Sequence, residues 1–281
     1  MALQIGSGIN IGNGIKVNSS DLPLITQGMN LYLDANANTV SLNEGSLGIW
    51  TDLSGTNNTG YIPASGVTYY SAYNGNPGYF SFNGGGTIYT TTNFGDSLMP
   101  QGSVGLWFRT NHTGMNKFIG LENSQIPSST TAYDRMIYAP SYTSEQAGYY
   151  MVTGFYTPVN GVNTVASTTN YNDNTWHYAF ITWDVKAGAG AFILYVDGKY
   201  VTLHTFFTND VGSMGGNAYW IIGGWKTSGW PGTTNASPWP AAGTFNSYYY
   251  GDISIVHAYN RALSSEEVYQ NFTATRSIFN V

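Results

Sequence analysis

The chain has 281 residues, of which only 9% are charged, and its formal net charge is −6. Nine Lys and Arg residues scattered along the chain cannot form the basic stripe that neutralises a phosphate backbone, so nucleic acid is not an expected partner. The lack of Cys excludes disulfides and thiolate metal sites, and no apolar run is long enough for a membrane span.

The composition favours strands over helices. Tyr (23), Phe (13) and Trp (8) suit the pleated, half-buried surface of a sheet. A β-sandwich forms a single domain of up to about 200–250 residues, so this length accommodates one large β domain. The N-terminus has neither the basic region nor the apolar block of a secretory signal, and we expect synthesis in the cytoplasm without a cleaved signal peptide.

Residues 1–22 differ from the rest and form a predicted N-terminal β arm. Ile-Gly-Ser-Gly-Ile at residues 5–9 recurs as Ile-Gly-Asn-Gly-Ile at residues 11–15, and this period of two predicts a strand. Its branched face carries Ile5, Ile9, Ile11, Ile15 and Val17. A strand of this kind needs a partner sheet. We expect the arm to pair with a neighbouring subunit or another protein, with pairing inside its own domain as the alternative.

Residues 23–281 are predicted to form one jelly-roll domain, because strand-like runs bounded by Gly, Pro and Asn follow at short spacing. Trp176–Trp183 alternates between two apolar faces, which predicts a central strand. Asp197-Gly198 favours a two-residue type I′ turn and therefore a hairpin. The expected strands are Met29–Asp34, Gly48–Thr51, Tyr79–Phe82, Ser103–Arg109, Lys117–Leu121, Met136–Ala139, Tyr149–Thr153, Trp176–Asp184, Ala191–Val196, Tyr219–Ile222 and Asp252–Tyr259.

Segment Gly223–Tyr250 is rich in aromatic residues set among Gly, Pro, Ser, Thr and Asn, and a long loop is expected there. Exposed rings surrounded by amides and hydroxyls fit a protein partner or a sugar ring. The alternative is a loop that packs on itself, since three prolines stiffen it. The candidate ligand- or partner-binding residues are Trp225, Trp230, Trp239, Tyr248 and Tyr249.

One helix is predicted, over about Ser265–Thr273. Ser264 is a suitable N-cap, and Glu267 stands at the third helical position, which together make a capping box. Val268 and Phe272, four residues apart, supply its apolar face.

Three segments, in this order, resemble the laminin-G-like, concanavalin-A-like superfamily as it occurs in bacterial and bacteriophage proteins. They contain the runs LYLDA (31–35), WTDLSG (50–55) and FSFNG (80–84), then NTWHY (174–178), TWD (182–184) and LYVDG (194–198), and finally GDISIV (251–256), YNRALS (259–264) and EE (266–267). The resemblance covers roughly residues 28–275. It implies an all-β, concanavalin-A-like jelly-roll sandwich with one short C-terminal helix.

The superfamily includes adhesins, sugar-binding modules and enzymes, so the fold alone does not decide the role. The closing segment looks like that of structural proteins of tailed bacteriophages, and the Gly/Ile arm and low charge agree with this. The resemblance implies a virion structural protein on the capsid or tail, which decorates the particle or contacts the host. A cellular carbohydrate-binding or adhesion module is the alternative. The expected partners are other virion proteins, further copies of the chain as a homo-oligomer, and a glycan.

We do not expect an enzyme. Retaining glycosidases place two carboxyl groups about 5–5.5 Å apart, which alternate positions on one strand supply. Here the glutamates form no such run; they are Glu44, Glu122, Glu145, Glu266 and Glu267. The histidines lack a paired ligand spacing; they are His112, His177, His204 and His257.

No cofactor is expected to be required, and calcium is the one that the resemblance leaves open. Some relatives bind Ca²⁺ through loop carboxylates, which suit a hard cation. The matching positions are Asp34, Asp52, Asp184 and Asp252. An Asp at a strand end also caps turns, as the run WTDLSG suggests for Asp52.

Overall fold

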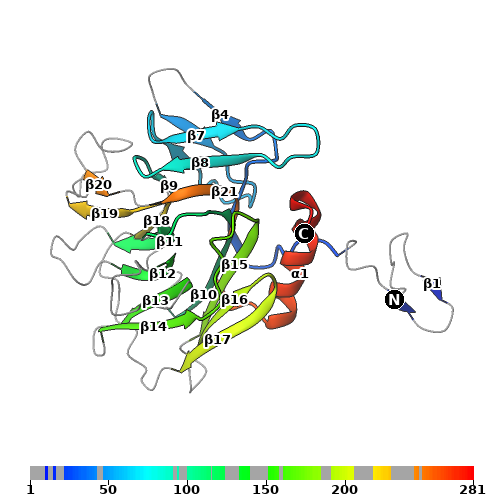
Figure 1. Ribbon diagram of the computed structural model, residues 1–281. Coiled ribbons are helices and arrows are strands. Elements are labelled where there is room, and N and C mark those ends of the chain that lie inside the picture. Colours follow the sequence, from blue (N-terminus) through cyan, green and yellow to red (C-terminus); the bar gives the residue numbers. More distant parts are fainter. Residues whose placement is uncertain are drawn as a thin grey trace.

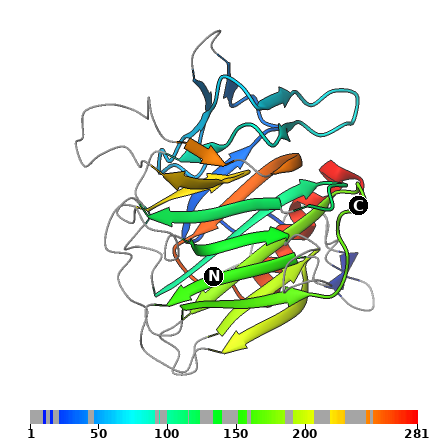
Figure 2. The same cartoon turned by 60° about the vertical axis from the view of Figure 1, so that its left-hand side comes forward.

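The computed structural model describes residues 10–11, 15–16, 22–42, 47–90, 94, 100–114, 116–123, 133–139, 151–157, 161–184, 191–205, 218–228, 244–246 and 249–281. Their regular structure is mostly β, in two large antiparallel sheets that lie face to face, with one α-helix near the C-terminus (Figures 1 and 2). The predicted all-β jelly-roll sandwich is therefore confirmed. Within this part of the chain, no helix is long and apolar enough to cross a membrane.

Sheet 1 is the sheet on which the helix packs. Its strand β21 pairs with three strands, since β8 and β3 share one of its edges. The strands in spatial order are β17 (Lys199–Thr205), β16 (Ala191–Val196), β15 (His177–Asp184), β10 (Gln101–Arg109), β21 (Tyr250–Tyr259), β8 (Tyr79–Asn83) and β7 (Val67–Tyr70), with β3 (Met29–Asp34) beside β21.

Sheet 2 closes the other side of the sandwich. Several of its strands have only two or three residues, too short to give a clear alternation in the sequence. The strands in spatial order are β14 (Gly161–Ser167), β13 (Met151–Thr157), β12 (Tyr133–Ala139), β11 (Asn116–Asn123), β18 (Ala218–Ile222), β9 (Ile88–Thr90), β6 (Gly60–Ile62), β5 (Gly48–Trp50) and β4 (Val40–Ser41).

Strand β15 is buried on both faces, which confirms the predicted central strand. Ala179, Ile181 and Trp183 belong to the core between the two sheets. Tyr178 and Phe180 belong to a second cluster on the outer face of sheet 1. Sheet 1 therefore carries apolar surface on its outer side, and this surface needs a cover.

Helix α1 (Ser265–Thr275) provides this cover, followed by a 3₁₀ turn at Arg276–Phe279. The side chain of Ser264 accepts a hydrogen bond from Glu267 N, and the Glu267 carboxylate accepts one from Ser264 N. The predicted capping box is therefore confirmed, and the helix begins where predicted and ends two residues later. A cap of this kind stabilises a helix by about 1 kcal/mol.

Trp107 of β10 is at the centre of the contact between helix and sheet. Its ring stacks on Phe279 and Phe272, with centroids 4.2 Å and 5.6 Å away. Its Nε1 donates to Thr275 Oγ1 at 2.8 Å, so the polar atom of this fully buried side chain has a partner. The stacking therefore fixes both the helix and the 3₁₀ turn against sheet 1.

Hydrogen bonds also tie the segment before β3 to the helix. Asn271 Oδ1 accepts from Ile25 N at 2.9 Å, and Asn271 Nδ2 donates to Tyr259 OH at 2.9 Å. Tyr259 OH in turn donates to Ile25 O at 3.0 Å, which closes the ring of bonds. Gln270 Nε2 donates to Pro23 O at 2.6 Å. The chain is thus attached to the sandwich from Pro23 onward.

The described part of the N-terminal arm is a hairpin, and the single continuous strand that the alternation predicts is wrong here. β1 (Asn10–Ile11) pairs antiparallel with β2 (Ile15–Lys16), so Ile11 faces Ile15 and the chain reverses between them. These two strands pair with neither large sheet. Three further arm residues, Ile5, Ile9 and Val17, lie outside the described residues, and the assembly role of the arm stays a prediction.

His257 is a buried histidine between sheet 1 and the helix. Its Nδ1 lies 3.0 Å from Tyr178 OH, while its Nε2 has no hydrogen-bond partner in the described part of the chain. Burial disfavours the imidazolium and lowers the pKa of His257 to about 3. The folded protein therefore keeps this ring neutral at mildly acidic pH values at which an exposed histidine is protonated.

This burial predicts a loss of stability in mild acid. A histidine of the unfolded chain has a pKa near 6.5, so between pH 6.5 and 3 the unfolded state binds the extra proton and the free energy of unfolding falls as pH falls. From pH 6.5 to 5 we expect the wild type to lose about 1.5 kcal/mol more than the His257→Gln variant. Urea unfolding at both pH values measures this difference, and equal losses in the two proteins would contradict it.

Candidate functional site

The aromatic segment Gly223–Tyr250 is not one long loop. β19 (Trp225–Ser228) pairs antiparallel with β20 (Thr244–Asn246), so a two-stranded ribbon forms its base. The side chain of Trp225, and the residues Trp230, Trp239 and Tyr248, lie outside the described part of the chain. Their role as binding residues stays a prediction.

The prediction that Tyr249 binds a ligand or partner is wrong, because its side chain is fully buried. Its ring packs edge-on against Phe82 with centroids 5.4 Å apart, inside the sandwich core. Its hydroxyl donates to the main-chain oxygens of Asp252 at 3.0 Å and Arg109 at 3.2 Å. Tyr249 thus stabilises the core and presents no ring to a partner.

Two of the predicted calcium ligands, Asp34 and Asp52, organise loops. Asp52 Oδ1 accepts from Tyr32 N at 2.8 Å and Asp52 Oδ2 accepts from Asn58 N at 2.9 Å. Burial raises the pKa of the Asp52 carboxyl, but these hydrogen bonds outweigh it and hold the pKa below its usual range. Asp34 Oδ1 accepts from Asn36 N at 2.8 Å. The turn-capping alternative therefore accounts for both residues.

The other two predicted ligands lie on different strands of sheet 1. Asp252 on β21 pairs with Arg109, whose Nη2 is 2.7 Å from Asp252 Oδ2. Asp184 ends β15 opposite Gln101. Within the described residues, no group of three His, Asp or Glu side chains lies close enough to hold a metal ion. Calcium binding at these four positions stays a prediction.

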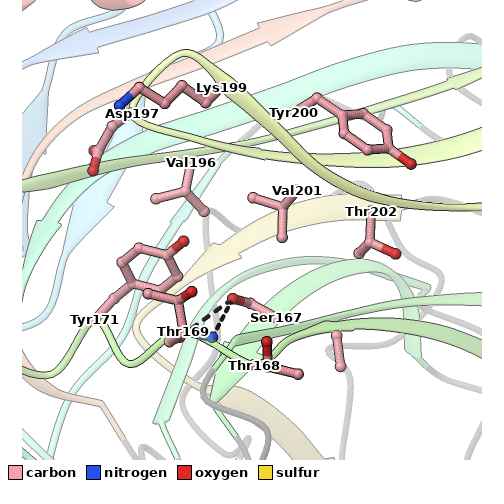
Figure 3. Close-up of a pocket in the computed structure, with 11 residues that line it drawn as sticks. Ser167, Thr168, Thr169, Tyr171, Val196, Asp197, Lys199, Tyr200, Val201 and Thr202 are labelled. Carbon is pink, nitrogen blue, oxygen red and sulfur yellow. Dashed lines mark hydrogen bonds between the residues drawn. The ribbon is translucent and has the colours of Figure 1, made fainter.

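A groove opens at the edge of the sandwich where the β16–β17 hairpin of sheet 1 faces the end of β14 in sheet 2 (Figure 3). Its volume is about 580 Å³, within the range of about 300–1,000 Å³ that small-molecule sites occupy. The lining residues are Ala166, Ser167, Thr168, Thr169, Tyr171, Val196, Asp197, Lys199, Tyr200, Val201 and Thr202.

The upper wall of the groove is the predicted hairpin. Asp197 and Gly198 have φ angles of 52° and 71°, as a type I′ turn requires, so this prediction is confirmed. After the turn, Tyr200 on edge strand β17 leaves 56% of its surface exposed. Val196 and Val201 point from this wall into the space between the walls and form an apolar floor (Figure 3).

The lower wall is the turn that follows β14. Ser167 Oγ accepts from Thr169 N at 3.0 Å and donates to Thr169 O, which fixes the turn (Figure 3). Tyr171 rises from this wall, and its ring packs edge-on against His177 with centroids 5.1 Å apart. The position of Tyr171 therefore depends on the imidazole behind it.

His177 connects the two walls. Its Nδ1 lies 2.9 Å from Asp197 Oδ2 and its Nε2 lies 3.2 Å from Asp173 Oδ1. Asp197 Oδ1 also accepts from Tyr178 N at 2.9 Å, which anchors the turn to β15. Burial lowers the pKa of His177, but the hydrogen bonds and charges of the two carboxylates outweigh it and raise the pKa above the ordinary value. The walls are thus held together by a charge-assisted bridge when His177 is protonated.

The groove combines the chemical groups that a polar ring compound needs. Tyr171 supplies an aromatic face, and Val196 and Val201 supply apolar contact. The Tyr200 ring lies on the other face of the hairpin, near Tyr195, with centroids 6.4 Å apart. The Lys199 ammonium and the Thr202 hydroxyl form no side-chain hydrogen bond or ion pair with any described residue, so both are available to a ligand. The arrangement suits a ligand that has one apolar face and a rim of hydroxyl groups.

The sequence patterns did not indicate this groove. Its walls come from residues 166–171 and 196–202, which belong to different sheets, and no short-range spacing connects them. The Asp197-Gly198 pair predicted a turn, but nothing in it indicated a binding site. The residues around Tyr200 do not indicate whether the return strand lies at the edge or in the middle of a sheet.

Solved structures share the fold, whereas no protein-family model and no curated protein sequence matches the chain. The binding domain of botulinum neurotoxin DC in complex with rat synaptotagmin II is 13% identical, with a TM-score of 0.60 over 89% of this chain and 52% of that one. The same domain in complex with SialylT is 14% identical, with a TM-score of 0.59 and the same coverage. The botulinum neurotoxin serotype C1 binding domain is 13% identical, with a TM-score of 0.56 over 88% and 52%. The chain spans about half the length of these structures, and the likeness shows a shared lectin-like β-sandwich fold.

The bridge across the groove predicts a specific titration. Because Asp197 is the first of the two carboxylates that raise the pKa of His177, we expect Asp197→Asn to lower that pKa, while the Asn side chain preserves the turn. Asp173→Asn should lower it less, since Asp173 is more exposed to solvent. NMR titration of the His177 ring protons measures both shifts. An unchanged midpoint in Asp197→Asn would show that the bridge does not form.

Proposed function

We propose that this protein is a non-catalytic carbohydrate-binding or adhesion module, and that the groove between the β16–β17 hairpin and the end of β14 binds the saccharide. The observation that carries the proposal is the groove itself, in which the Tyr171 ring stands among hydroxyl groups beside the apolar side chains of Val196 and Val201. Sugars have apolar C–H faces and hydroxyl edges, so they need both kinds of contact in one place.

The comparisons support a binding module. The matched structures are binding domains of toxins, one in complex with synaptotagmin II and one with SialylT. They are relatives in fold and not in sequence, so their ligands suggest only the class of role. A module that binds another molecule agrees with both complexes.

The acidic residues of the groove argue against hydrolysis. A glycosidase needs two carboxyl groups on either side of the scissile bond. Among the described lining residues, Asp197 is the only acidic one, and both of its oxygens accept hydrogen bonds from the protein. The groove therefore supports binding without turnover.

More specifically, we propose that the protein is part of a bacteriophage virion. This proposal rests on the Gly/Ile arm and the sequence resemblance. In that setting the module would be a capsid or tail protein that contacts the host through its groove, in company with other virion proteins. Mass spectrometry of purified phage particles from the source tests this: the chain is expected among the structural proteins, and its absence would leave the cellular adhesion module.

Groove variants test the proposed function. On an array of neutral and charged glycans we expect the wild type to bind a defined subset. We expect Tyr171→Ala and Thr202→Val each to weaken this binding at least about fivefold, the effect of losing roughly 1 kcal/mol at a contact residue. Tyr73→Ala, after β7 at the other end of sheet 1 and 72% exposed, is the matched control and should bind as the wild type does. Binding that survives both groove substitutions would refute the groove as the site.

A further inference from the structure

A second cluster of aromatic and charged side chains lies on the outer face of sheet 1, at the opposite end from the groove. Tyr70 on edge strand β7 stacks on Tyr79 of β8, with ring centroids 4.9 Å apart and an interplanar angle of 21°. The Arg109 guanidinium lies over the Tyr79 ring at 5.3 Å and over the Trp176 ring at 4.9 Å. These four side chains and Asp252 form what we call the outer platform.

The charged groups of the outer platform are held in fixed geometry. Arg109 Nε and Nη2 both donate to Asp252 Oδ2, at 2.9 Å and 2.7 Å. No described residue forms a hydrogen bond with Asp252 Oδ1 or Arg109 Nη1, and neither side chain is fully buried, since 15% and 30% of their surfaces are exposed. Within the described residues, one acceptor and one donor of the ion pair are thus left for a ligand, and the two rings and the ion pair already order them.

The platform is open at the Tyr70 end. Tyr70 leaves 48% of its surface exposed on an edge strand, while Trp176 at the other end packs on Phe279 of the 3₁₀ turn, with centroids 4.9 Å apart. The aromatic layer on the outer face of sheet 1 therefore extends beyond the part that the helix and 3₁₀ turn cover, and it ends at the exposed ring of Tyr70. A tyrosine at such a position offers a large rigid contact surface at low cost in conformational entropy.

These features define the class of ligand. A carboxylate oxygen that accepts and a guanidinium nitrogen that donates suit the hydroxyls of a sugar, each of which can donate and accept. The exposed tyrosine suits the apolar face of the same ring. Because Arg109 and Asp252 neutralise each other, the platform has no net charge with which to select an anionic ligand.

We infer that the outer platform is a second saccharide-binding site, specific for neutral pyranoses and independent of the groove. Two sites on one small module let a chain of sugars, or several chains on one surface, bind with higher avidity than either site alone. Ordering costs are low at the platform, because Arg109 and Asp252 keep their geometry without the ligand.

Binding at the outer platform can be measured directly by NMR in the wild-type protein. The Arg109 Nε–Hε group gives its own signal in a ¹H–¹⁵N NMR spectrum, and its hydrogen bond to Asp252 places that proton within the platform. Neutral trisaccharides of glucose, galactose, mannose and N-acetylglucosamine are titrated separately to millimolar concentration. At least one of them is expected to shift the Arg109 signal together with the Tyr70 and Tyr79 amides. If none moves these signals, the inference is wrong.

Variants then assign the contacts. Tyr70→Ala is expected to weaken the binding seen at the Arg109 signal at least about fivefold, while Tyr70→Phe keeps the ring and retains binding. Arg109→Lys keeps the charge but loses the planar fork, and should weaken binding as well, measured at the Tyr79 amide because this variant lacks the Arg109 signal. Binding at the platform that is unchanged in both Tyr70→Ala and Arg109→Lys would overturn the assignment.

The two sites can fail separately. Tyr171→Ala in the groove should leave the platform titration unchanged, and Tyr70→Ala should leave binding at the groove unchanged. If the groove variants remove glycan binding and the platform signals never move, the proposed function stands and the second site does not exist. If the platform signals move but the groove variants have no effect, the second site stands and the groove assignment fails.

Discussion

The structure depends on the need to cover the outer face of sheet 1. Strand β15 is apolar on both sides and β10 adds Trp107 to the outer side, so the sandwich core covers only the inner half of their apolar side chains. The C-terminal helix and its 3₁₀ turn cover the other half, with Trp107 stacked on Phe272 and Phe279. Truncation of a buried Trp costs about 3–5 kcal/mol, a large part of the 5–15 kcal/mol by which a domain is stable. A sandwich without this cover would expose a continuous aromatic surface to water.

The same constraint explains where binding surfaces remain. The helix covers the middle of sheet 1 and contacts the β16–β17 hairpin, whereas edge strand β7 at the other end of the sheet leaves Tyr70 exposed. The exposed Tyr70 ends the outer platform at this uncovered end, while the groove opens between the two sheets, where the β16–β17 hairpin faces the end of β14. Both sites use polar groups that the fold already holds in place: Asp197 by the hairpin turn, and Arg109 by Asp252. Structural and binding roles are therefore carried by the same hydrogen bonds.

Features with a local cause could be predicted from the sequence. The strand Met29–Asp34, the Asp197-Gly198 turn and the Ser264–Glu267 capping box each depend on residues within a few positions of one another. Features that depend on long-range contacts could not. The groove joins residues 166–171 to residues 196–202, and the very short strands of sheet 2 are held by their neighbours rather than by a pattern of their own. Tyr249 shows a second limit, since aromatic content in a segment does not tell which rings turn into the core. Alternation in the arm indicated strand but not that Ile11 would pair with Ile15.

The central claim is that the groove beside the β16–β17 hairpin and the outer platform both bind saccharide. The most direct measurement is a crystal structure of the full chain soaked with the neutral trisaccharide that binds most tightly. The account predicts sugar density in the groove between Tyr171 and the β16–β17 hairpin, and a second sugar against Tyr70 with its hydroxyls on Arg109 and Asp252. Sugar found instead at the predicted aromatic residues Trp230 and Trp239, with the groove and the outer platform both empty, would contradict it.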